Sequence, residues 1–407
     1  MIAPADWTAY QLVDLLKFSN GINADKAAYG RGTRFVNVLE VITNESLMAQ
    51  DIPGRVSLPD KVLARYLVKR GDVLFNRTSE TQDEVGLSSI YLDDELVVFG
   101  GFVFRGHPKT GDMDVGYAKY GLRAGDVRRQ IVARGQGGIR ANIGQRDLNT
   151  VVVRLPELPE QRAIAHTIDH VSSLARAIDA LIVKKRAIKQ GMIKDLLSGR
   201  TRLPGFVDEW QPSMIGTMAR VIGGGTPSTR VPAFWDGPIP WLTPGEISSE
   251  GAGLLGRSER SITARGLAES GANMLPAGTV LVTSRASIGN CAVADVPLTT
   301  NQGFASMIPS DPRSTWFLYY WVQENRRELE SRAAGSTFLE ISAGKVASIA
   351  LDMPSLPEQE MIGQVLRDVD LEMDVLRRRK NKVEAIKTGM MQTLLTGRVR
   401  LVVEATS

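Results

Sequence analysis

The sequence predicts two globular α/β (α+β) domains and two long antiparallel coiled-coil helices, arranged as an internal pseudo-twofold duplication. Three observations predict this: a segment repeated 198 residues apart, a 3.5-residue apolar period inside both copies, and aromatic residues confined to the stretches outside them. A chain of 407 residues is long enough for several domains with their own cores. The predicted order is a globular domain at 1–154 (domain 1), a helical segment at 155–203, a second globular domain at 204–352 (domain 2) and a second helical segment at 353–407.

The repeat is the clearest feature of the sequence. Leu155–Leu203 and Met353–Leu401 align without a gap and are identical at 19 of 49 positions. The identities gather at the two ends, in PELPEQ against PSLPEQ and in AIKQGMIKDLLSGRTRL against AIKTGMMQTLLTGRVRL. Two unrelated amphipathic helices would not share one ungapped frame and matching ends, so the pattern indicates a duplication.

Each repeat predicts one long helix. Pro159 and Pro357 suit a first helical turn, where the missing N–H costs no hydrogen bond. Gly199 and Gly397 follow the apolar pattern, where a left-handed cap is expected. Steps of four and three give eight apolar residues in ten for both repeats, which is a coiled-coil seam. The two seams are Ile164, Ile168, Val171, Ala175, Ile178, Ile182, Lys185, Lys189, Met192 and Leu196, and Ile362, Leu366, Val369, Met373, Leu376, Lys380, Val383, Lys387, Met390 and Leu394.

The two globular segments resemble one another more loosely. Each opens with a tryptophan, Trp7 or Trp210, and each contains a short β-like run after glycine, GDVLFNRTS at Gly71 and GTVLVTSRAS at Gly278. Each reaches its helix through a glycine-containing polar loop and a β-branched run. Strand-like and helical patterns alternate, so each segment is expected to fold as α/β or α+β.

Composition sets broad limits on function. The net charge of +4 permits a nucleic-acid partner without requiring one. The single cysteine, Cys291, fits a reducing compartment. No run of 18 apolar residues and no signal-peptide pattern is found. We therefore expect a cytoplasmic protein.

The sequence lacks the motifs of several enzyme classes. It has no GxxxxGK[ST] phosphate loop, and no Asp or Glu stands two residues before a lysine as in restriction-type nuclease sites. His166 and His170 have metal-ligand spacing, but the second repeat has Gln364 and Asp368 there, so a solvated face is expected and no metal site is predicted. Three classes stay open: a non-enzymatic DNA-targeting subunit, a fused methylase or nuclease, and a coiled-coil scaffold with protein-binding globular domains.

Several motifs recur in order along the chain. Domain 2 carries GGTPSTRVPAFWDGPIPWLTPGEI at 223–247, TSRASIGNCAVA at 283–294 and TNQGF at 300–304. Domain 1 carries GDVLFNRTS and EVGLSSIYL, and LPEQ occurs at 158 and 356. Together these motifs resemble one known family, the specificity subunits of type I restriction-modification systems. Domain 1 departs from the family pattern at 20–60, where FSNGINADKAAYG stands in place of the GGTPS stretch.

The resemblance implies two target-recognition domains that each read one half of a split DNA sequence. It implies that the helices set the spacing and dock two modification (methyltransferase) subunits, and that restriction subunits join the assembly. S-adenosylmethionine, ATP and Mg would be used by those partner subunits. This chain would bind no cofactor and would have no catalysis of its own.

Candidate DNA-binding residues are polar side chains on predicted loops, because Arg, Asn, Gln, Ser and Thr read base edges in the major groove. In domain 1 they are Asn76, Arg77, Thr78, Ser79, Arg140 and Asn142. In domain 2 they are Thr226, Ser228, Thr229, Arg230, Ser284, Arg285, Ser287, Asn301, Gln302 and Arg332. The repeated helix ends have more apolar residues than one coiled-coil seam requires. They therefore predict a partner-docking surface at Met192, Leu196, Leu197, Met390, Leu394 and Leu395.

Overall fold

The computed structural model describes residues 4, 6–137, 140–248, 253–335 and 339–401, and forms two compact units. Unit 1 consists of Met1–Asp179 and Arg379–Ser407, and unit 2 of Ala180–Arg378. Each unit contains one globular domain, part of the first long helix and part of the second. The predicted helices are α7, Leu158–Leu196, and α13, Leu356–Leu394.

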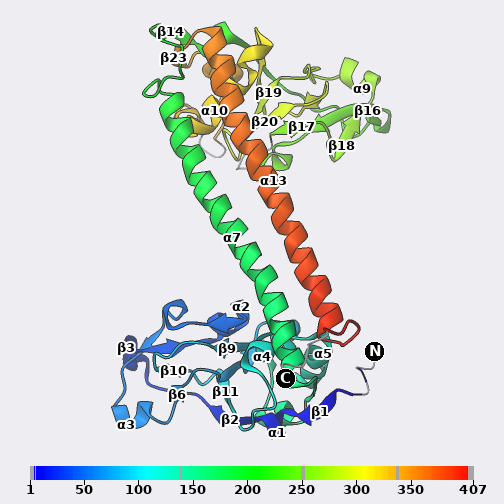
Figure 1. Ribbon diagram of the computed structural model, residues 1–407. Helices are drawn as coiled ribbons and strands as arrows, with labels where there is room; N and C mark the ends of the chain where they lie inside the picture. The colour runs from blue at the N-terminus through cyan, green and yellow to red at the C-terminus, as the bar shows by residue number, and fades with distance from the viewer. Residues whose placement is uncertain (1–3, 5, 138–139, 249–252, 336–338, 402–407) are drawn as a thin grey trace. The chain divides into compact units, whose positions relative to one another are not determined.

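Domain 1 is built on two mixed β-sheets (Figure 1). The five-stranded sheet has the order β2 (Leu16–Asn20), β11 (Val103–Pro108), β7 (Val73–Asn76), β9 (Ser88–Tyr91) and β4 (Ser46–Leu47). The four-stranded sheet has the order β5 (Arg55–Val56), β3 (Tyr29–Val36), β10 (Val97–Phe99) and β6 (Leu67–Val68). Two short ribbons complete the domain: β1 (Thr8–Gln11) with β13 (Val152–Leu155), and β8 (Thr78–Ser79) with β12 (Ala141–Asn142).

Alternation along the central strand β7 places a core on both faces of the five-stranded sheet. Val73 and Phe75 face one apolar cluster, while Leu74 faces another. The first cluster includes residues of α4 (Val115–Gly121), α5 (Gly125–Arg134) and α7, and the second includes residues from strands of both sheets. The short helices of domain 1 are α1 (Leu12–Leu15), α2 (Val38–Thr43), α3 (Asp60–Leu63), α4 (Val115–Gly121), α5 (Gly125–Arg134) and α6 (Gln145–Asn149), and its 3₁₀ turns are Lys26–Ala28, Ala49–Asp51 and Gln82–Glu84.

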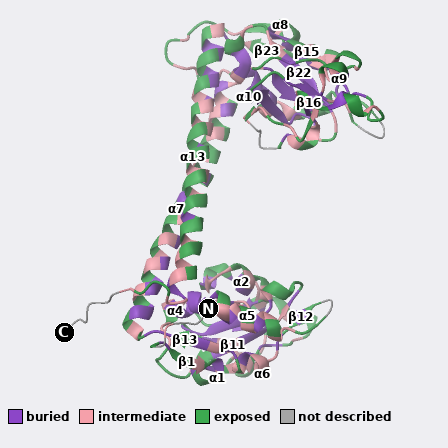
Figure 2. Ribbon diagram, turned by 90° about the vertical axis from the view of Figure 1, so that its right-hand side faces the viewer, coloured by how far each residue is buried: buried purple, intermediate pink, exposed green. Residues whose placement is uncertain are grey.

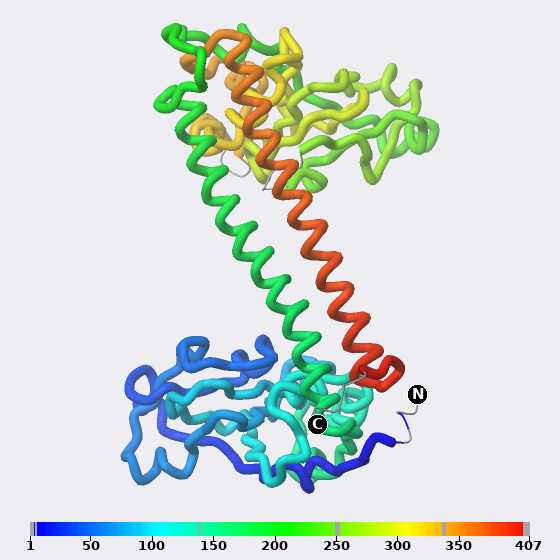
Figure 3. Tube along the Cα trace, viewed as in Figure 1, coloured from blue at the N-terminus to red at the C-terminus, as the bar shows by residue number. Residues whose placement is uncertain are grey.

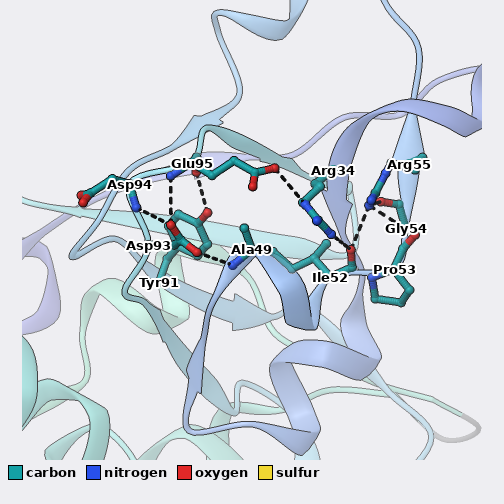
Figure 4. A network of polar contacts seen from close by, with 10 residues as sticks. All are labelled: Arg34, Ala49, Ile52, Pro53, Gly54, Arg55, Tyr91, Asp93, Asp94 and Glu95. Atoms are coloured by element: carbon teal, nitrogen blue, oxygen red, sulfur yellow. Dashed lines mark hydrogen bonds and ion pairs between the residues drawn. The ribbon is translucent and has the colours of Figure 1, made fainter.

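A polar network connects the two sheets of domain 1 (Figure 4). Arg34, on β3, donates to Glu95 at 2.8 Å, and the hydroxyl of Tyr91, at the end of β9, donates to the carbonyl of Glu95. The backbone N–H of Ala49 donates to Asp93 at 2.9 Å, and this bond lowers the pKa of the Asp93 carboxyl. The network joins strands that belong to different sheets.

Domain 2 repeats most of this topology, with a second sheet of three strands where domain 1 has four. Its five-stranded sheet has the order β15 (Ala219–Gly223), β22 (Ala305–Pro309), β19 (Val280–Val282), β20 (Cys291–Ala294) and β17 (Leu254–Leu255). A three-stranded sheet holds β18 (Arg260–Ile262), β16 (Trp235–Leu242) and β21 (Thr299–Thr300), and β14 (Gln211–Met214) pairs with β23 (Ala350–Met353). Its helices are α8 (Ile215–Met218), α9 (Ala264–Ala268), α10 (Thr315–Glu324), α11 (Arg326–Ser331) and α12 (Ala343–Ala347), with 3₁₀ turns at Pro232–Phe234, Pro244–Glu246 and Pro312–Ser314.

An irregularity in strand pairing also occurs in both domains. In domain 1 both Tyr29 and Thr33 of β3 lie opposite Val56, and in domain 2 both Trp235 and Ile239 of β16 lie opposite Ile262. Figure 3 allows the reader to follow the path of each domain. The predicted duplication of mixed α/β domains is confirmed.

Within each unit the two long helices run antiparallel. Lys380 pairs with Asp179 at 2.8 Å in unit 1, and Lys189 pairs with Asp370 at 2.6 Å in unit 2. Every predicted seam position is buried or half-buried, whereas the outer faces are largely exposed (Figure 2). Gly199 and Gly397 have φ of 67° and 69°, so both predicted left-handed caps are confirmed.

The four lysines that interrupt the apolar seams all form ion pairs. Besides the two named above, Lys185 pairs with Glu372, and Lys387 pairs with Glu45 at 2.6 Å. The long alkyl stem of a lysine covers the seam while its ammonium group reaches a carboxylate. The coiled-coil pattern therefore continues through these positions without burying an unpaired charge.

The matching ends of the repeats bind each other. In unit 1 Arg400, from the end of the second repeat, donates to both carboxylate oxygens of Glu160, at the start of the first repeat. In unit 2 Arg202 does the same with Glu358, which also accepts from the indole N–H of Trp210 at 3.2 Å. We call these two contacts the Arg–Glu clasps. They account for the glutamate of LPEQ and the second arginine of GRxRL in both repeats.

Candidate nucleic-acid interface

The predicted DNA-binding residues of domain 1 meet on the β8–β12 ribbon. Asn142 lies opposite Thr78, whose hydroxyl donates to the Asn142 side-chain oxygen at 2.7 Å. The Asn142 amide N–H donates to the carbonyl of Arg140 at 3.2 Å. Arg77, Arg140 and Asn142 are exposed, and Thr78 is half-buried. The ribbon thus presents two cationic groups and an oriented amide to solvent.

A short hairpin holds this ribbon in place. Gln136 and Asn142 exchange both backbone hydrogen bonds, at 2.8 and 2.7 Å. Gly137, which follows Gln136, has a φ of 127°, which is unfavourable for residues with a Cβ atom. The N–H of Ile143 then donates to the carbonyl of Arg77 at 3.0 Å, which fixes the hairpin against the end of β7.

Domain 2 builds the same hairpin from different side chains. Ala334 and Glu340 exchange both backbone bonds, and Gly335 has φ of 135°. The counterpart of Asn142, 198 residues later, is Glu340, which lies opposite Arg285 and pairs with it at 2.9 Å. The side chains of Arg285 and Glu340 are 42% and 40% exposed, so both groups remain accessible to a ligand.

Backbone hydrogen bonds establish which residues correspond. The N–H of Ile341 donates to the carbonyl of Ser284, as that of Ile143 donates to Arg77. The N–H of Ser284 donates to the carbonyl of Gly303, as that of Arg77 donates to Phe102. Thr78 therefore corresponds to Arg285.

A second polar edge of domain 2 gathers other predicted residues. The hydroxyl of Thr226 donates to Gln302, and both side chains are exposed. Asn301 is half-buried, because its side-chain oxygen accepts from the N–H of Gly303 at 2.8 Å and closes a turn. In domain 1 the corresponding turn holds Phe102, which is 62% exposed.

Other predicted residues lie at the surface without joining these clusters through side-chain bonds. Ser228, Thr229 and Arg230 are exposed in the loop after β15, and Ser287 is half-buried. Arg332 is exposed and forms an ion pair with Glu328 one turn earlier, at 2.6 Å.

Three predicted residues are corrected by their burial. Asn76, Ser79 and Ser284 are 0%, 4% and 2% exposed, so their side chains do not face a ligand. Asn76 ends a central strand, and Ser79 donates to Glu84 at 2.9 Å. The sequence pattern did not show which side chains of these loops point inward.

Burial also corrects three of the six predicted partner-docking residues. Leu196, Leu394 and Leu395 are each 4% exposed and belong to the cores of their own units. Met192, Leu197 and Met390 are half-buried and pack against the same cores. The buried leucines of the repeated helix ends therefore pack inside each unit, whereas docking at Met192, Leu197 and Met390 stays a prediction.

The described residues contain no group of three or more His, Cys, Asp or Glu side chains placed to hold a metal ion. Burial raises the pKa of Cys291 to about 12, so its thiol is protonated at neutral pH and is a poor nucleophile. Within the described part of the chain, no helix has the length and apolar character needed to cross a bilayer.

Two relevant residues escaped the sequence analysis, Glu340 and Phe102. The 198-residue offset that relates the helices also relates Asn142 to Glu340, so extending that alignment into the preceding loop would have found Glu340. No sequence signal marks Phe102, because an aromatic after two glycines is typical of a strand and turn.

Comparison with known proteins agrees with this architecture. Residues 207–385 match the family model described as the type I restriction modification DNA specificity domain. The MjaIX specificity subunit of Methanocaldococcus jannaschii, a type I restriction enzyme subunit, is 36% identical over 181 residues, which are 44% of this chain and 41% of that relative. The aligned stretch is therefore less than half the length of that relative.

Two longer matches cover nearly the whole chain. A putative type I restriction enzyme MjaX specificity subunit of the same organism is 22% identical, over 98% of this chain and 95% of its own length. The crystal structure of the S subunit from M. genitalium superposes with a TM-score of 0.60 at 15% identity, covering 97% of this chain and 99% of that one. At that identity the superposition shows a common fold. Residues 207–385 thus resemble the type I restriction modification DNA specificity domain, and the chain as a whole is similar in sequence and fold to specificity subunits of type I restriction-modification systems.

Proposed function

We propose that this protein is the DNA sequence-specificity subunit of a type I restriction-modification complex, with each globular domain reading one half of a bipartite target. In this role the chain has no catalysis and directs the enzymes of other subunits. It would act in the cytoplasm. Phosphate contacts would position each domain, and base contacts would select the sequence.

One observation carries the proposal: the same exposed hairpin is built twice with different polar side chains. The backbone bonds of Gln136–Asn142 recur at Ala334–Glu340, yet the cross-strand pairs are Thr78–Asn142 in one domain and Arg285–Glu340 in the other. A structural role would favour similar side chains at both places. Two different half-sites would favour a common backbone with different base-reading groups.

The long helices support a spacing role. Each is continuous over 39 residues, about 58 Å at 1.5 Å per residue, and each runs from one unit into the other. We propose that they fix the gap between half-sites, for which one DNA turn is on the order of 34 Å. The gap would then be a constant number of unspecified base pairs.

Partner docking would use exposed apolar residues on the helices. In unit 2 these are Leu181, Val183 and Ile188 on α7 and Leu371 and Val375 on α13, all at least 41% exposed. Apolar side chains on an otherwise polar helical face are typical of protein interfaces. Two modification subunits would dock on the chain and restriction subunits would join them, and these partners would bind S-adenosylmethionine, ATP and Mg.

The decisive experiment compares methylated-adenine maps of the host genome with and without this gene. A split motif should vanish when the gene is deleted, and replacing residues 204–352 with those of a relative should change one half only. Retention of every methylated motif after deletion would contradict the proposal. Binding of the complex to the motif should also weaken steeply with salt, whereas a protein-binding scaffold would show no sequence preference.

Docking is tested separately by Val183→Asp with Val375→Asp. We expect loss of copurifying modification subunits with unchanged thermal unfolding of the chain, because both side chains are exposed. Gln190→Asp, at another exposed position of α7, is the matched control and should keep the normal stoichiometry. Unchanged stoichiometry in the double variant would exclude this surface.

A further inference from the structure

We propose that the cross-strand pairs Thr78–Asn142 and Arg285–Glu340 are the base-reading pairs of the two domains, and that they select different base pairs. Asn142 would recognise adenine of an A·T pair, and Arg285 with Glu340 would recognise both bases of a G·C pair. This inference rests on the proposed function and deepens it, because it assigns a chemical preference to each half-site.

The β8–β12 ribbon has the form that the DNA major groove accepts. The major groove admits a two-stranded β-ribbon, and the side chains of such a ribbon reach base edges. In domain 1 the exposed member of the Thr78–Asn142 pair is the amide of Asn142. Arg77 and Arg140 flank it and are exposed, so they are placed to contact phosphates.

The amide of Asn142 is oriented before any ligand binds. Its oxygen accepts from Thr78 at 2.7 Å, and its nitrogen donates to the carbonyl of Arg140 at 3.2 Å. A side-chain amide has two acceptor lone pairs and two N–H groups, so one of each is left over. That remaining pair matches the N6 amino group and N7 of adenine, which asparagine binds in a bidentate manner.

The corresponding pair of domain 2 offers a different pattern. Arg285 contributes five N–H donors and Glu340 two carboxylate oxygens, and their mutual contact at 2.9 Å uses only part of this capacity. Arginine donates to O6 and N7 of guanine, and a carboxylate accepts from N4 of cytosine. One G·C pair presents these groups side by side, so adjacent Arg and Glu side chains match it.

The exposure of the Arg285–Glu340 pair argues against a purely structural role, because ion pairs this exposed contribute little to stability. The neighbouring backbone is also unusual, since Ala286 has φ of 59°, a left-handed conformation that alanine rarely adopts. Backbone strain of this kind is retained where it positions a functional side chain. Ala286 directly follows Arg285 and turns the chain at that point.

The test uses the complex of this chain with its modification subunits and duplexes that carry its methylated motif. Each adenine or guanine is replaced in turn by its 7-deaza analogue, which keeps base pairing and removes the N7 acceptor. We expect one 7-deazaadenine, in the half read by domain 1, to weaken binding by about tenfold. We expect one 7-deazaguanine in the other half to have the same effect.

Variants then assign these effects to residues. The 7-deazaadenine effect should disappear in Asn142→Ala, and the 7-deazaguanine effect in Arg285→Ala. Arg265 forms an exposed ion pair with Glu269 at 2.8 Å elsewhere in domain 2, so Arg265→Ala is the matched control and should retain both effects. The exchange Arg285→Thr with Glu340→Asn should change one G·C pair of the methylated motif to A·T and leave the other half unchanged.

The inference is overturned if the wild-type complex binds its motif selectively and no 7-deaza purine weakens binding. It is also overturned if the losses persist undiminished in Asn142→Ala and Arg285→Ala. These outcomes leave the proposed function intact. A wild-type complex with no preference for any split sequence would instead refute the proposed function, and the inference with it.

Discussion

Arg400 donates from Nε and Nη2 to the two carboxylate oxygens of Glu160, each at 2.7 Å, although 240 residues separate them in the chain. Arg202 binds Glu358 in the same way across 156 residues. Each glutamate side chain is nearly buried, at 7% and 1% exposure. The clasps therefore join the two repeats at both ends through charge-assisted, bidentate hydrogen bonds.

The first prediction concerns the clasps. Glu358→Gln should lower the free energy of unfolding of unit 2 by about 2 kcal/mol. The substitution replaces a buried carboxylate, which accepts two hydrogen bonds from Arg202, by a neutral amide that can accept only one of them. Asp195→Asn, which affects the exposed pair with Arg200 at 3.0 Å, is the control and should change stability by less than about 0.5 kcal/mol. Urea denaturation measures both, and equal effects would show that the clasp is not stabilising.

The second prediction concerns Asn76, whose side-chain nitrogen and oxygen are buried without a hydrogen-bond partner among the described residues. At the corresponding position of domain 2, the hydroxyl of Thr283 donates to the carbonyl of Asn290 at 3.2 Å. Asn76→Thr should therefore stabilise domain 1 by about 1 kcal/mol. Thr283→Asn should destabilise domain 2, and thermal unfolding that shifts in the opposite directions would contradict this account.

The third prediction concerns the turn of the domain 1 hairpin. A Cβ atom on Gly137 would lie 2.0 Å from the carbonyl oxygen of Arg140, at a φ of 127°. Gly137→Ala should strain the hairpin by roughly 1–2 kcal/mol and weaken specific DNA binding. Gly111→Ala, where nothing lies within 4 Å of the added Cβ, is the control and should bind normally in a fluorescence anisotropy titration.

The fourth prediction concerns acid stability. Burial works to raise the pKa of Asp169, but the hydrogen bonds from Lys119 and Tyr120, each 2.6 Å, outweigh it and lower that pKa below the ordinary value of 3.8. A carboxyl with a lowered pKa in the folded state contributes stability above pH 3.8, and this contribution is lost as the pH falls through the folded value.

The measurement is urea unfolding of the wild type and Asp169→Asn between pH 7 and pH 2.5. The wild type should be the more stable at pH 7, and the difference should shrink as the pH falls below about 5. A stability difference that stays constant down to pH 2.5 would show that the ionised form of Asp169 is not favoured by folding.

The sequence predicted the helices well because their signals are local and repeated. The seam from Ile164 to Leu196 follows a period that chance does not sustain, and the caps at Gly199 and Gly397 follow from backbone conformation alone. The duplication itself was evident because the two repeats align at a constant offset of 198 residues. These features depend on residues close together in the chain, so no knowledge of tertiary contacts was needed.

The candidate site was harder to predict, because the direction in which each side chain points depends on contacts between distant segments. Asn76, Arg77 and Thr78 are adjacent in sequence, yet only Arg77 is fully at the surface and Asn76 is fully buried. The apolar pattern around Leu196 and Leu394 is the same for residues that contact a partner and for residues that pack in their own core. The sequence therefore could not distinguish the two cases. Lys387 and Glu45 pair across 342 residues, which no local pattern reveals.

The clasp at Glu160 also sets an order for folding during synthesis. The core of unit 1 includes Leu394 and Leu395. Glu160 can form its clasp only after Arg400, 240 residues downstream, has been synthesised. At about 5–20 residues per second, that wait is roughly 10–50 s on the ribosome. The domain translated first is thus the last to be completed, and a nascent chain that terminates early would release its amino-terminal half with an open core.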